Sequence, residues 1–241
     1  MKIVFLLSSL GSGGAERVAS TLSNAWVERG DLVTLVPTFS GGGAPFYQLD
    51  SRVEVRYLAQ EVGIAGASGR GKRYFQRFAA LRRLIRERNP DVVLSFLPNV
   101  NIAALAATAF TRIPCIVSER SDPSVQPIGR FWSLACWMFY RFADAVTVQT
   151  EYVAKRIEAI YPGLRRVAVM PNPLPAALLG QAQSQPVEVS HSGSSSQVLL
   201  SVGRLAPEKR TDLLVDAFVQ LSPQFPNWVL HLVGDGPLRS S

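Results

Sequence analysis

The stretch SVGRLAPEK, residues 201–209, joins a predicted strand to a predicted helix. The apolar run Val198–Leu200 before it predicts a short buried strand, and residues 210–219 after it have the apolar spacing of a helix. Gly203 therefore leaves the end of a strand, Arg204 follows at once, and Lys209 lies where the helix begins. Parallel sheets bind ligands at the carboxyl ends of their strands, so this order aims two cations at a binding crevice.

The two cations have the chemistry of a diphosphate site. Arginine offers a planar set of donors to phosphate oxygens, and lysine offers a point charge. From these residues alone, a solvated loop at the end of a strand is an equally good interpretation.

A family resemblance favours the diphosphate site. The run GRLAPEK, residues 203–209, resembles the donor site of the retaining family 4 glycosyltransferases, which have the GT-B fold and include the glycosyl transferases group 1 domain. The resemblance implies that Arg204 and Lys209 are catalytic and hold the diphosphate of a nucleotide sugar, with Gly203 beside them. The string HLVGDGPL, residues 231–238, resembles the next marker of the family and adds Gly234 to the donor site.

A second glycine-rich loop, GSGGAE at residues 11–16, follows the apolar run Ile3–Leu7. We expect the run to be a first buried strand and the loop to open a helix that extends to about Arg29. Such a turn presents free N–H groups that suit phosphate. The third glycine of a dinucleotide fingerprint would fall on Glu16, which argues against NAD binding.

This loop also resembles the family. The string GGAER resembles its first loop, which implies that the amides of Gly13 and Gly14 approach the donor phosphate and that Glu16 and Arg17 face the acceptor. The alternatives are that Glu16 complements the helix dipole and that Arg17 is solvated.

A third candidate site is SERSDP, residues 118–123, after the predicted strand 113–117. It resembles a motif of family 4 enzymes that build lipid-linked or surface polysaccharides, which implies an acceptor-side role for Glu119 and Arg120. Other members carry a histidine near here and this chain does not. The alternative is a local ion pair between Glu119 and Arg120. The hinge PNP, residues 171–173, also matches the family and places Asn172 on the acceptor side.

The remaining patterns complete an α/β order of strands and helices. Further strands are predicted at residues 31–37, 53–58, 91–97, 143–150 and 167–170, with that at 53–58 toward the sheet edge, and helices at 101–110 and 151–160. We expect a GT-B-like fold with an N-terminal Rossmann-like domain at 1–173, a linker at 174–197 that is rich in Ser and Gln, and a partial second Rossmann-like domain at 198–241.

Two helices suggest contact with other surfaces. Residues 70–88 hold eight basic residues and one acidic residue, with apolar residues at helical spacing. This pattern predicts a helix that docks on anionic lipid, or a core-facing helix with a solvated basic face. Nucleic acid is not expected, because the aromatic residues lie on the apolar face. The run FWSLACWMFY, residues 131–140, predicts a buried helix, with contact to lipid as the alternative.

Composition limits the class of protein. The chain has 241 residues, a net charge of +7 and 47% hydrophobic residues, which is typical of a globular protein. Cys115 and Cys136 show neither metal-ligand spacing nor a disulfide framework, which favours a reducing compartment. We expect a cytoplasmic protein, or one peripheral to the inner face of the plasma membrane.

The resemblance implies retaining transfer of a hexose from a nucleotide-sugar donor to a hydroxyl of a lipid-linked or surface polysaccharide intermediate. No cofactor and no metal are expected. The family's acidic pair lies beyond the matched region, so we expect this chain to be an inactive fragment. The alternatives are a nucleotide-sugar epimerase of the same fold and a non-catalytic fragment that binds nucleotide or glycan.

Overall fold

The structure is a computed structural model that describes residues 1–62, 70–123, 128–175 and 196–239, without the side chains of residues 70–73. It divides into two compact units, Met1–Gln183 (unit 1) and Ser184–Ser241 (unit 2). Most of the predicted linker, at residues 176–195, lies outside the described residues.

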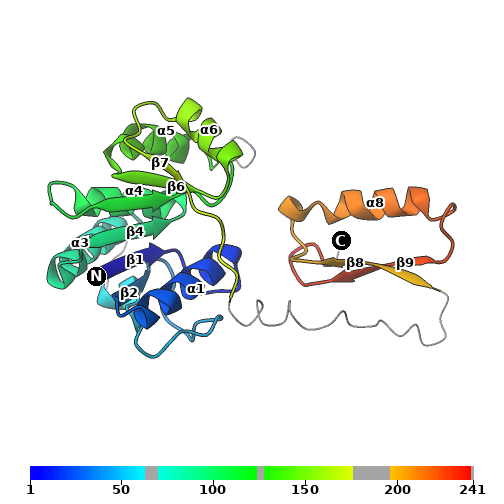
Figure 1. Cartoon of the computed structure of the whole chain (residues 1–241), viewed down its shortest axis with the longest axis horizontal. Helices are drawn as coiled ribbons and strands as arrows, with labels where there is room; N and C mark the ends of the chain where they lie inside the picture. The colour runs from blue at the N-terminus through cyan, green and yellow to red at the C-terminus, as the bar shows by residue number, and fades with distance from the viewer. Residues whose placement is uncertain (63–69, 124–127, 176–195, 240–241) are drawn as a thin grey trace. The chain divides into compact units, whose positions relative to one another are not determined.

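Unit 1 is built on a parallel sheet of seven strands in the order β3-β2-β1-β4-β5-β6-β7 (Figure 1). The strands are β1 (Lys2–Leu7), β2 (Leu32–Pro37), β3 (Glu54–Val55), β4 (Val92–Phe96), β5 (Cys115–Ser118), β6 (Ala145–Val148) and β7 (Val167–Val169). β1 pairs on one side with β2, Ile3 opposite Val33, and on the other with β4, Ile3 opposite Val92. The direction of winding therefore reverses between β1 and β4, which is where open α/β sheets place their ligand crevice.

Helices cover both faces of this sheet. They are α1 (Gly14–Glu28), α2 (Leu58–Glu61), α3 (Arg70–Arg88), α4 (Pro98–Thr108), α5 (Arg130–Phe139), the 3-10 turn η1 (Tyr140–Phe142) and α6 (Glu151–Ile160). Side chains alternate between faces along β1, because successive residues of a strand point to opposite sides. Phe5 and Leu7 pack with α1 in one core, whereas Val4 and Leu6 pack with α3, α4 and α6 in the other. The parallel α/β fold predicted from the sequence is confirmed.

Some boundaries differ from the predictions. The strand expected at residues 53–58 has only two residues, at the sheet edge as expected, and α2 begins at Leu58. Helix α4 begins at Pro98 instead of residue 101, because a proline in the first helical turn needs no hydrogen-bond donor.

The prediction that residues 131–140 form a buried helix was wrong. In α5 only Ala135 and Cys136 are buried. Four large apolar side chains of the helix are exposed: Phe131, Leu134, Trp137 and Met138, at 72%, 56%, 43% and 42% of their surface. This helix therefore presents an apolar face that no other described part of unit 1 covers.

Unit 2 is small. Strands β8 (Gln197–Val202) and β9 (Trp228–Val233) pair in parallel, and the 3-10 turn η2 (Pro207–Lys209) and α8 (Thr211–Leu221) follow β8. Most side chains of both strands remain exposed, and Ala206 is the buried apolar residue among the described part of this unit. The unit is a partial Rossmann-like domain, since two strands and one helix cannot cover both faces of a parallel sheet.

Candidate functional site

The carboxyl ends of the unit 1 strands gather the predicted residues along one edge of the sheet, called here the strand-end edge. Gly13 and Gly14 follow β1, Glu119 and Arg120 follow β5, and Asn172 follows β7. Since all seven strands are parallel, these loops emerge on the same side of unit 1.

The helix start after β1 is occupied by a carboxylate of its own chain. Gly13 caps α1, and a Cβ at this position would lie 2.2 Å from Oε2 of Glu16. The absence of a side chain at Gly13 lets Glu16 fold back over the first turn, where Ser9 Oγ donates to its Oε1 at 2.9 Å. Glu16 is thereby placed to complement the helix dipole. A phosphate at the amides of Gly13 and Gly14 requires this carboxylate to turn away.

Arg17 is exposed beside the same loop. Its guanidinium carbon lies 5.8 Å from the ring centre of Tyr47, whose hydroxyl donates to the carbonyl oxygen of Ser12 at 2.9 Å. Tyr47 therefore links the glycine loop to Arg17, a contact that sequence reasoning missed.

Glu119 is buried at the end of β5 and belongs to a chain of polar groups in the core. The Tyr140 hydroxyl donates to Oε1 of Glu119, and Asn101 Nδ2 donates to that hydroxyl at 3.0 Å. Asn101 also donates to the carbonyl oxygen of Ser118 at 3.1 Å and accepts from Ser95 Oγ at 2.8 Å. Burial raises the pKa of Glu119 to about 7, against the lowering effect of the Tyr140 hydrogen bond. These hydrogen bonds anchor the start of the loop after β5 to the core of unit 1.

Arg120 points to a different side from Glu119, and no ion pair joins the two side chains in the part of unit 1 that the structure describes. Its Nη2 donates to Oδ1 of Asn172, 52 residues away along the chain, and its guanidinium lies 4.5 Å from the ring centre of Phe96. Its Nε and Nη1 are buried and have no acceptor among the residues that the structure describes. Burial lowers the pKa of Arg120. The structure therefore brings together two of the predicted acceptor-side residues, Arg120 and Asn172.

The donor-side residues of unit 2 surround a small hollow of about 90 Å³. It is lined by Ser201, Val202, Gly203, Arg204, Leu205, Lys209, Thr211, Leu232 and Val233. A Cβ on Gly234 would lie 1.8 Å from the carbonyl oxygen of Gly203, so the loops after β8 and β9 approach too closely for any other residue. The two glycines expected at the donor site meet here.

Arg204 has a carboxylate partner that sequence reasoning missed. It forms an ion pair with Glu208, four residues later, and hydrogen bonds from the Glu208 backbone and from Arg204 lower the pKa of Glu208. The spacing of four residues is the signal that could have found it. A diphosphate in the hollow would compete with this exposed carboxylate for the Arg204 guanidinium.

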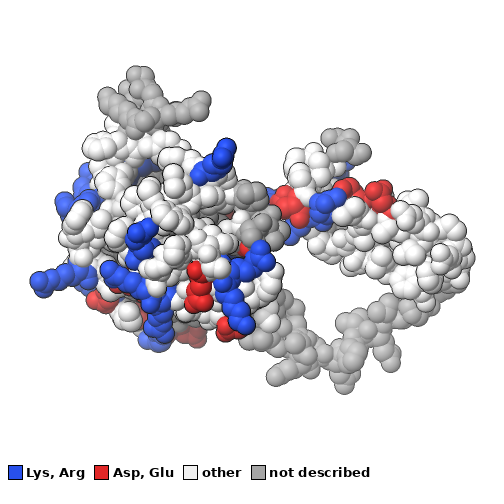
Figure 2. Space-filling view, turned by 90° about the horizontal axis from the view of Figure 1, so that it is seen from above, with Lys and Arg blue, Asp and Glu red and all other residues white. Residues whose placement is uncertain are grey.

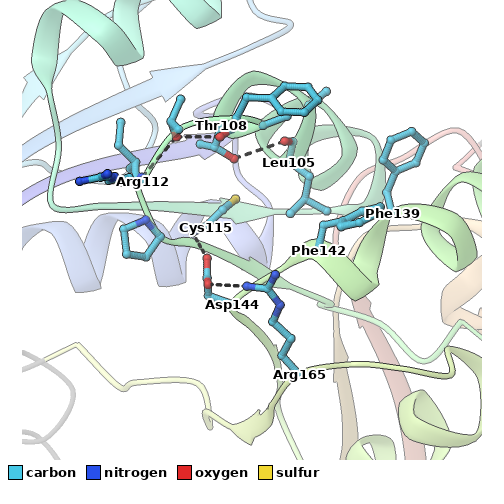
Figure 3. A pocket seen from close by; sticks show the side chains of 14 residues that line it. Leu105, Thr108, Arg112, Cys115, Phe139, Phe142, Asp144 and Arg165 are labelled. Carbon is cyan, nitrogen blue, oxygen red and sulfur yellow. Dashed lines mark hydrogen bonds and ion pairs between the residues drawn. The ribbon is translucent and has the colours of Figure 1, made fainter.

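Figure 3 shows a larger hollow, of about 580 Å³, at the other edge of the unit 1 sheet. Cys115 begins β5 there, and its backbone N–H donates to Oδ2 of Asp144 at 2.8 Å while Arg165 Nη1 lies 3.1 Å from Oδ1. Burial raises the pKa of the Cys115 thiol to about 12, so it is not a nucleophile at neutral pH. This hollow contains none of the predicted site residues.

Charge is divided unequally between the units. Residues 1–183 contain 21 basic and 13 acidic residues, a balance of +8, whereas residues 184–241 contain 4 and 5, a balance of −1. Figure 2 shows basic side chains spread over one face of unit 1 with fewer acidic ones among them. Among the described residues no group of three or more His, Cys, Asp or Glu is placed to hold a metal ion, and no described helix has the length and apolar character to cross a bilayer.

Comparison with solved structures shows the fold. HepE of Anabaena, in a complex with UDP and glucose, matches 98% of this chain and 61% of its own with a TM-score of 0.70 and 20% identity. Sucrose-phosphate synthase of Thermosynechococcus elongatus matches 97% and 62% with a TM-score of 0.71 and 15% identity. The chain has the fold of the GT-B glycosyltransferases, with a small, partial second domain.

Sequence comparison then shows the family. The Glycosyltransferase Family 4 model matches residues 12–177, and the Glycosyl transferases group 1 model matches residues 187–241. The chain belongs to Glycosyltransferase Family 4.

Two curated relatives have named activities. The GalNAc-alpha-(1->4)-GalNAc-alpha-(1->3)-diNAcBac-PP-undecaprenol alpha-1,4-N-acetyl-D-galactosaminyltransferase of Campylobacter jejuni is 30% identical over 99% of this chain and 63% of its own length. The amylovoran biosynthesis glycosyltransferase AmsD of Erwinia amylovora is 25% identical over 98% and 62%. The chain thus spans less than two thirds of the length of these relatives.

Proposed function

We propose that the protein transfers a hexose, with retention, from a nucleotide-sugar donor to a hydroxyl of a lipid-linked or surface polysaccharide intermediate. The names of the Campylobacter jejuni and Erwinia amylovora relatives support this class of acceptor, and the UDP and glucose bound to HepE support the class of donor. Unit 1 would bind the acceptor and unit 2 the donor.

The observation that carries the proposal is the hollow of unit 2, where Arg204 and Lys209 lie at the end of a parallel strand. In the proposed reaction the bond between the sugar C1 and the diphosphate oxygen breaks and a bond from C1 to the acceptor oxygen forms. Two cations stabilise the negative charge that develops on the departing diphosphate. A phosphate oxygen of the leaving group takes the acceptor proton, so the mechanism needs no protein nucleophile, no metal and no cofactor.

The test is binding of diphosphates to the purified chain. We expect UDP and inorganic pyrophosphate to bind and UMP to bind more weakly, because UMP lacks the second phosphate. Arg204→Gln and Lys209→Gln should each weaken UDP binding at least tenfold, which is about 1.4 kcal/mol, because a hydrogen bond between charged groups contributes ~1.5–3 kcal/mol. The matched control is Arg210→Gln, which removes a cation of the same unit that is paired with Asp212 and does not line the hollow. Equal UDP affinity in all four proteins would remove the diphosphate assignment.

An epimerase of the same fold is the alternative enzyme. Product analysis separates the two activities, because an epimerase converts the nucleotide sugar without an acceptor and a transferase consumes it only when an acceptor is present. A fragment that binds nucleotide or glycan without turnover would bind UDP and give neither product.

A second proposal is contact with an anionic membrane, for which the exposed apolar face of α5 is the specific observation. Arg141 stacks 5.2 Å from the Trp137 ring centre at the end of this face, an arrangement of aromatic and cationic groups suited to a bilayer interface. Helix α3 contributes less than its sequence predicts, because Arg83 pairs with Glu87 and Arg88 with Glu54. A position at the inner face of the plasma membrane is part of this proposal.

A further inference from the structure

Arg120 has donors that no described residue accepts from. The Nε and Nη1 nitrogens are both buried without an acceptor in the described part of the chain, although every nitrogen of a guanidinium carries N–H donors. Native structures pair nearly all buried polar groups, so two buried and unpaired nitrogens on a half-buried cation indicate a missing partner.

The side chain is held in place for such a partner. Phe96 at the end of β4 supports one face of the guanidinium at 4.5 Å, and Asn172 after β7 accepts from Nη2. Both contacts come from the strand-end edge, and neither supplies negative charge. They fix the direction of the guanidinium and leave two of its three nitrogens without an acceptor among the described residues.

No carboxylate neutralises Arg120 in the described part of the chain. Glu119 turns into the core toward Tyr140, and Asp122 lies 3.3 Å from Nε of Arg156. A single water could accept from one nitrogen but would leave the half-buried charge of Arg120 without a counter-charge, which costs free energy. The missing partner is therefore expected to be an anion.

We propose that Arg120 binds a phosphate or diphosphate group of the acceptor at the strand-end edge of unit 1. That the ligand is the acceptor rests on the proposed function, whereas the anion site itself rests on the geometry of Arg120. A planar guanidinium matches the oxygens of a phosphate better than a lysine does. The balance of +8 on unit 1 draws an anionic molecule to this unit.

The experiment measures pyrophosphate binding to the full chain by calorimetry in an Arg204→Gln, Lys209→Gln background, which removes the cations of the other unit. We expect Arg120→Gln in this background to raise the Kd for pyrophosphate at least tenfold. Arg120→Lys should give an intermediate value because it keeps the charge and loses the planar donors. The control is Arg112→Gln, an exposed cation beside the hollow at the opposite edge, which should leave the Kd unchanged.

Asn172→Ala guards against a fold defect in the Arg120 variants. It leaves the cation in place but removes the acceptor that orients it. Because Asn172 is exposed, its replacement should not unfold the protein, so a higher Kd would report the lost orientation of Arg120. We expect a several-fold loss of pyrophosphate affinity with an unchanged melting curve. Pyrophosphate affinity that stays the same in Arg120→Gln, or in both Arg120→Lys and Asn172→Ala, would overturn the proposal.

Two further measurements distinguish a lipid-linked phosphate from a free one, and the Arg120 site from the proposed function. Farnesyl diphosphate, a soluble polyprenyl diphosphate, should bind more tightly than pyrophosphate and lose affinity in Arg120→Gln if the acceptor is lipid-linked. Equal affinity of the two compounds would assign the site to a free phosphate group. Unchanged UDP binding in the Arg204→Gln variant would refute the proposed function while the Arg120 dependence of pyrophosphate binding stays intact.

Discussion

Glu119 should make unit 1 less stable as the pH rises through the neutral range. Its pKa is raised by burial from 4.5 to about 7 in the folded protein. Below pH 4.5 both folded and unfolded chains hold the proton, and Glu119 adds nothing to the pH dependence. Between 4.5 and about 7 the unfolded chain releases the proton and the folded chain keeps it, so the free energy of unfolding falls as the pH rises.

The magnitude follows from the size of the pKa difference. Each pKa unit corresponds to about 1.4 kcal/mol, so the full loss between pH 4.5 and 7 is about 3 kcal/mol. Glu119→Gln replaces the carboxyl by a neutral group that can still accept from the Tyr140 hydroxyl. We therefore expect the variant to match the parent near pH 5 and to exceed its free energy of unfolding by about 3 kcal/mol at pH 8.

The assay is urea unfolding followed by tryptophan fluorescence at pH 5 and pH 8. A Trp228→Phe background confines the signal to unit 1, because the other tryptophans are Trp26, Trp132 and Trp137. Glu158→Gln is the matched control, since Glu158 is exposed on α6. If Glu119→Gln and its parent show the same change in unfolding free energy between the two pH values, the buried protonated carboxyl is refuted.

Three other predictions concern a glycine of unit 2, a helix cap of unit 1 and binding to membranes. Gly234→Ala should destabilise unit 2 by about 1–3 kcal/mol in thermal unfolding, because the added Cβ would lie 1.8 Å from the carbonyl oxygen of Gly203. Gly203→Ala is the control and should be nearly neutral, because a Cβ there meets no atom within 4 Å. Thr150→Ala should lower the free energy of unfolding of unit 1 by about 1 kcal/mol in urea, because Thr150 caps α6 by accepting from the Val153 N–H at 3.3 Å. Thr150→Ser should keep most of this stabilisation, because serine has the same hydroxyl. The chain should co-sediment with anionic vesicles more than with neutral ones, because each cation near an anionic surface adds ~1 kcal/mol. High salt should reduce this co-sedimentation, because it screens the attraction. Leu134→Glu should weaken co-sedimentation, whereas Tyr152→Glu, at another exposed apolar position, should not.

Much of the fold could be predicted because it depends on local pattern. The continuous apolar run of β1 is buried on both faces, as a parallel strand between two helical layers must be. The loops after β1 and β5 in unit 1 and the loop after β8 in unit 2 hold the predicted glycines and charges, because ligand-binding loops of a parallel sheet follow the carboxyl ends of its strands. The roles of those residues stay predictions.

Some features could not be predicted. The apolar spacing of residues 131–140 indicates a helix but not what covers it, and α5 leaves Leu134 and Trp137 exposed. The partners of Glu119 and Arg120 come from distant parts of the chain, Tyr140 and Asn172. No pattern in the sequence pairs them.

Local patterns in the sequence were enough to predict the α/β order, the parallel sheet and the family, because apolar periodicity and motifs of glycines and charges extend over a few neighbouring residues. The tertiary structure was needed to show that the adjacent residues Glu119 and Arg120 have different environments. Glu119 is a buried carboxyl with a raised pKa, and Arg120 is a cation with two nitrogens that find no acceptor among the described residues. Neighbours at the end of a strand point to opposite sides of the sheet, and what each meets there depends on the elements packed against that side.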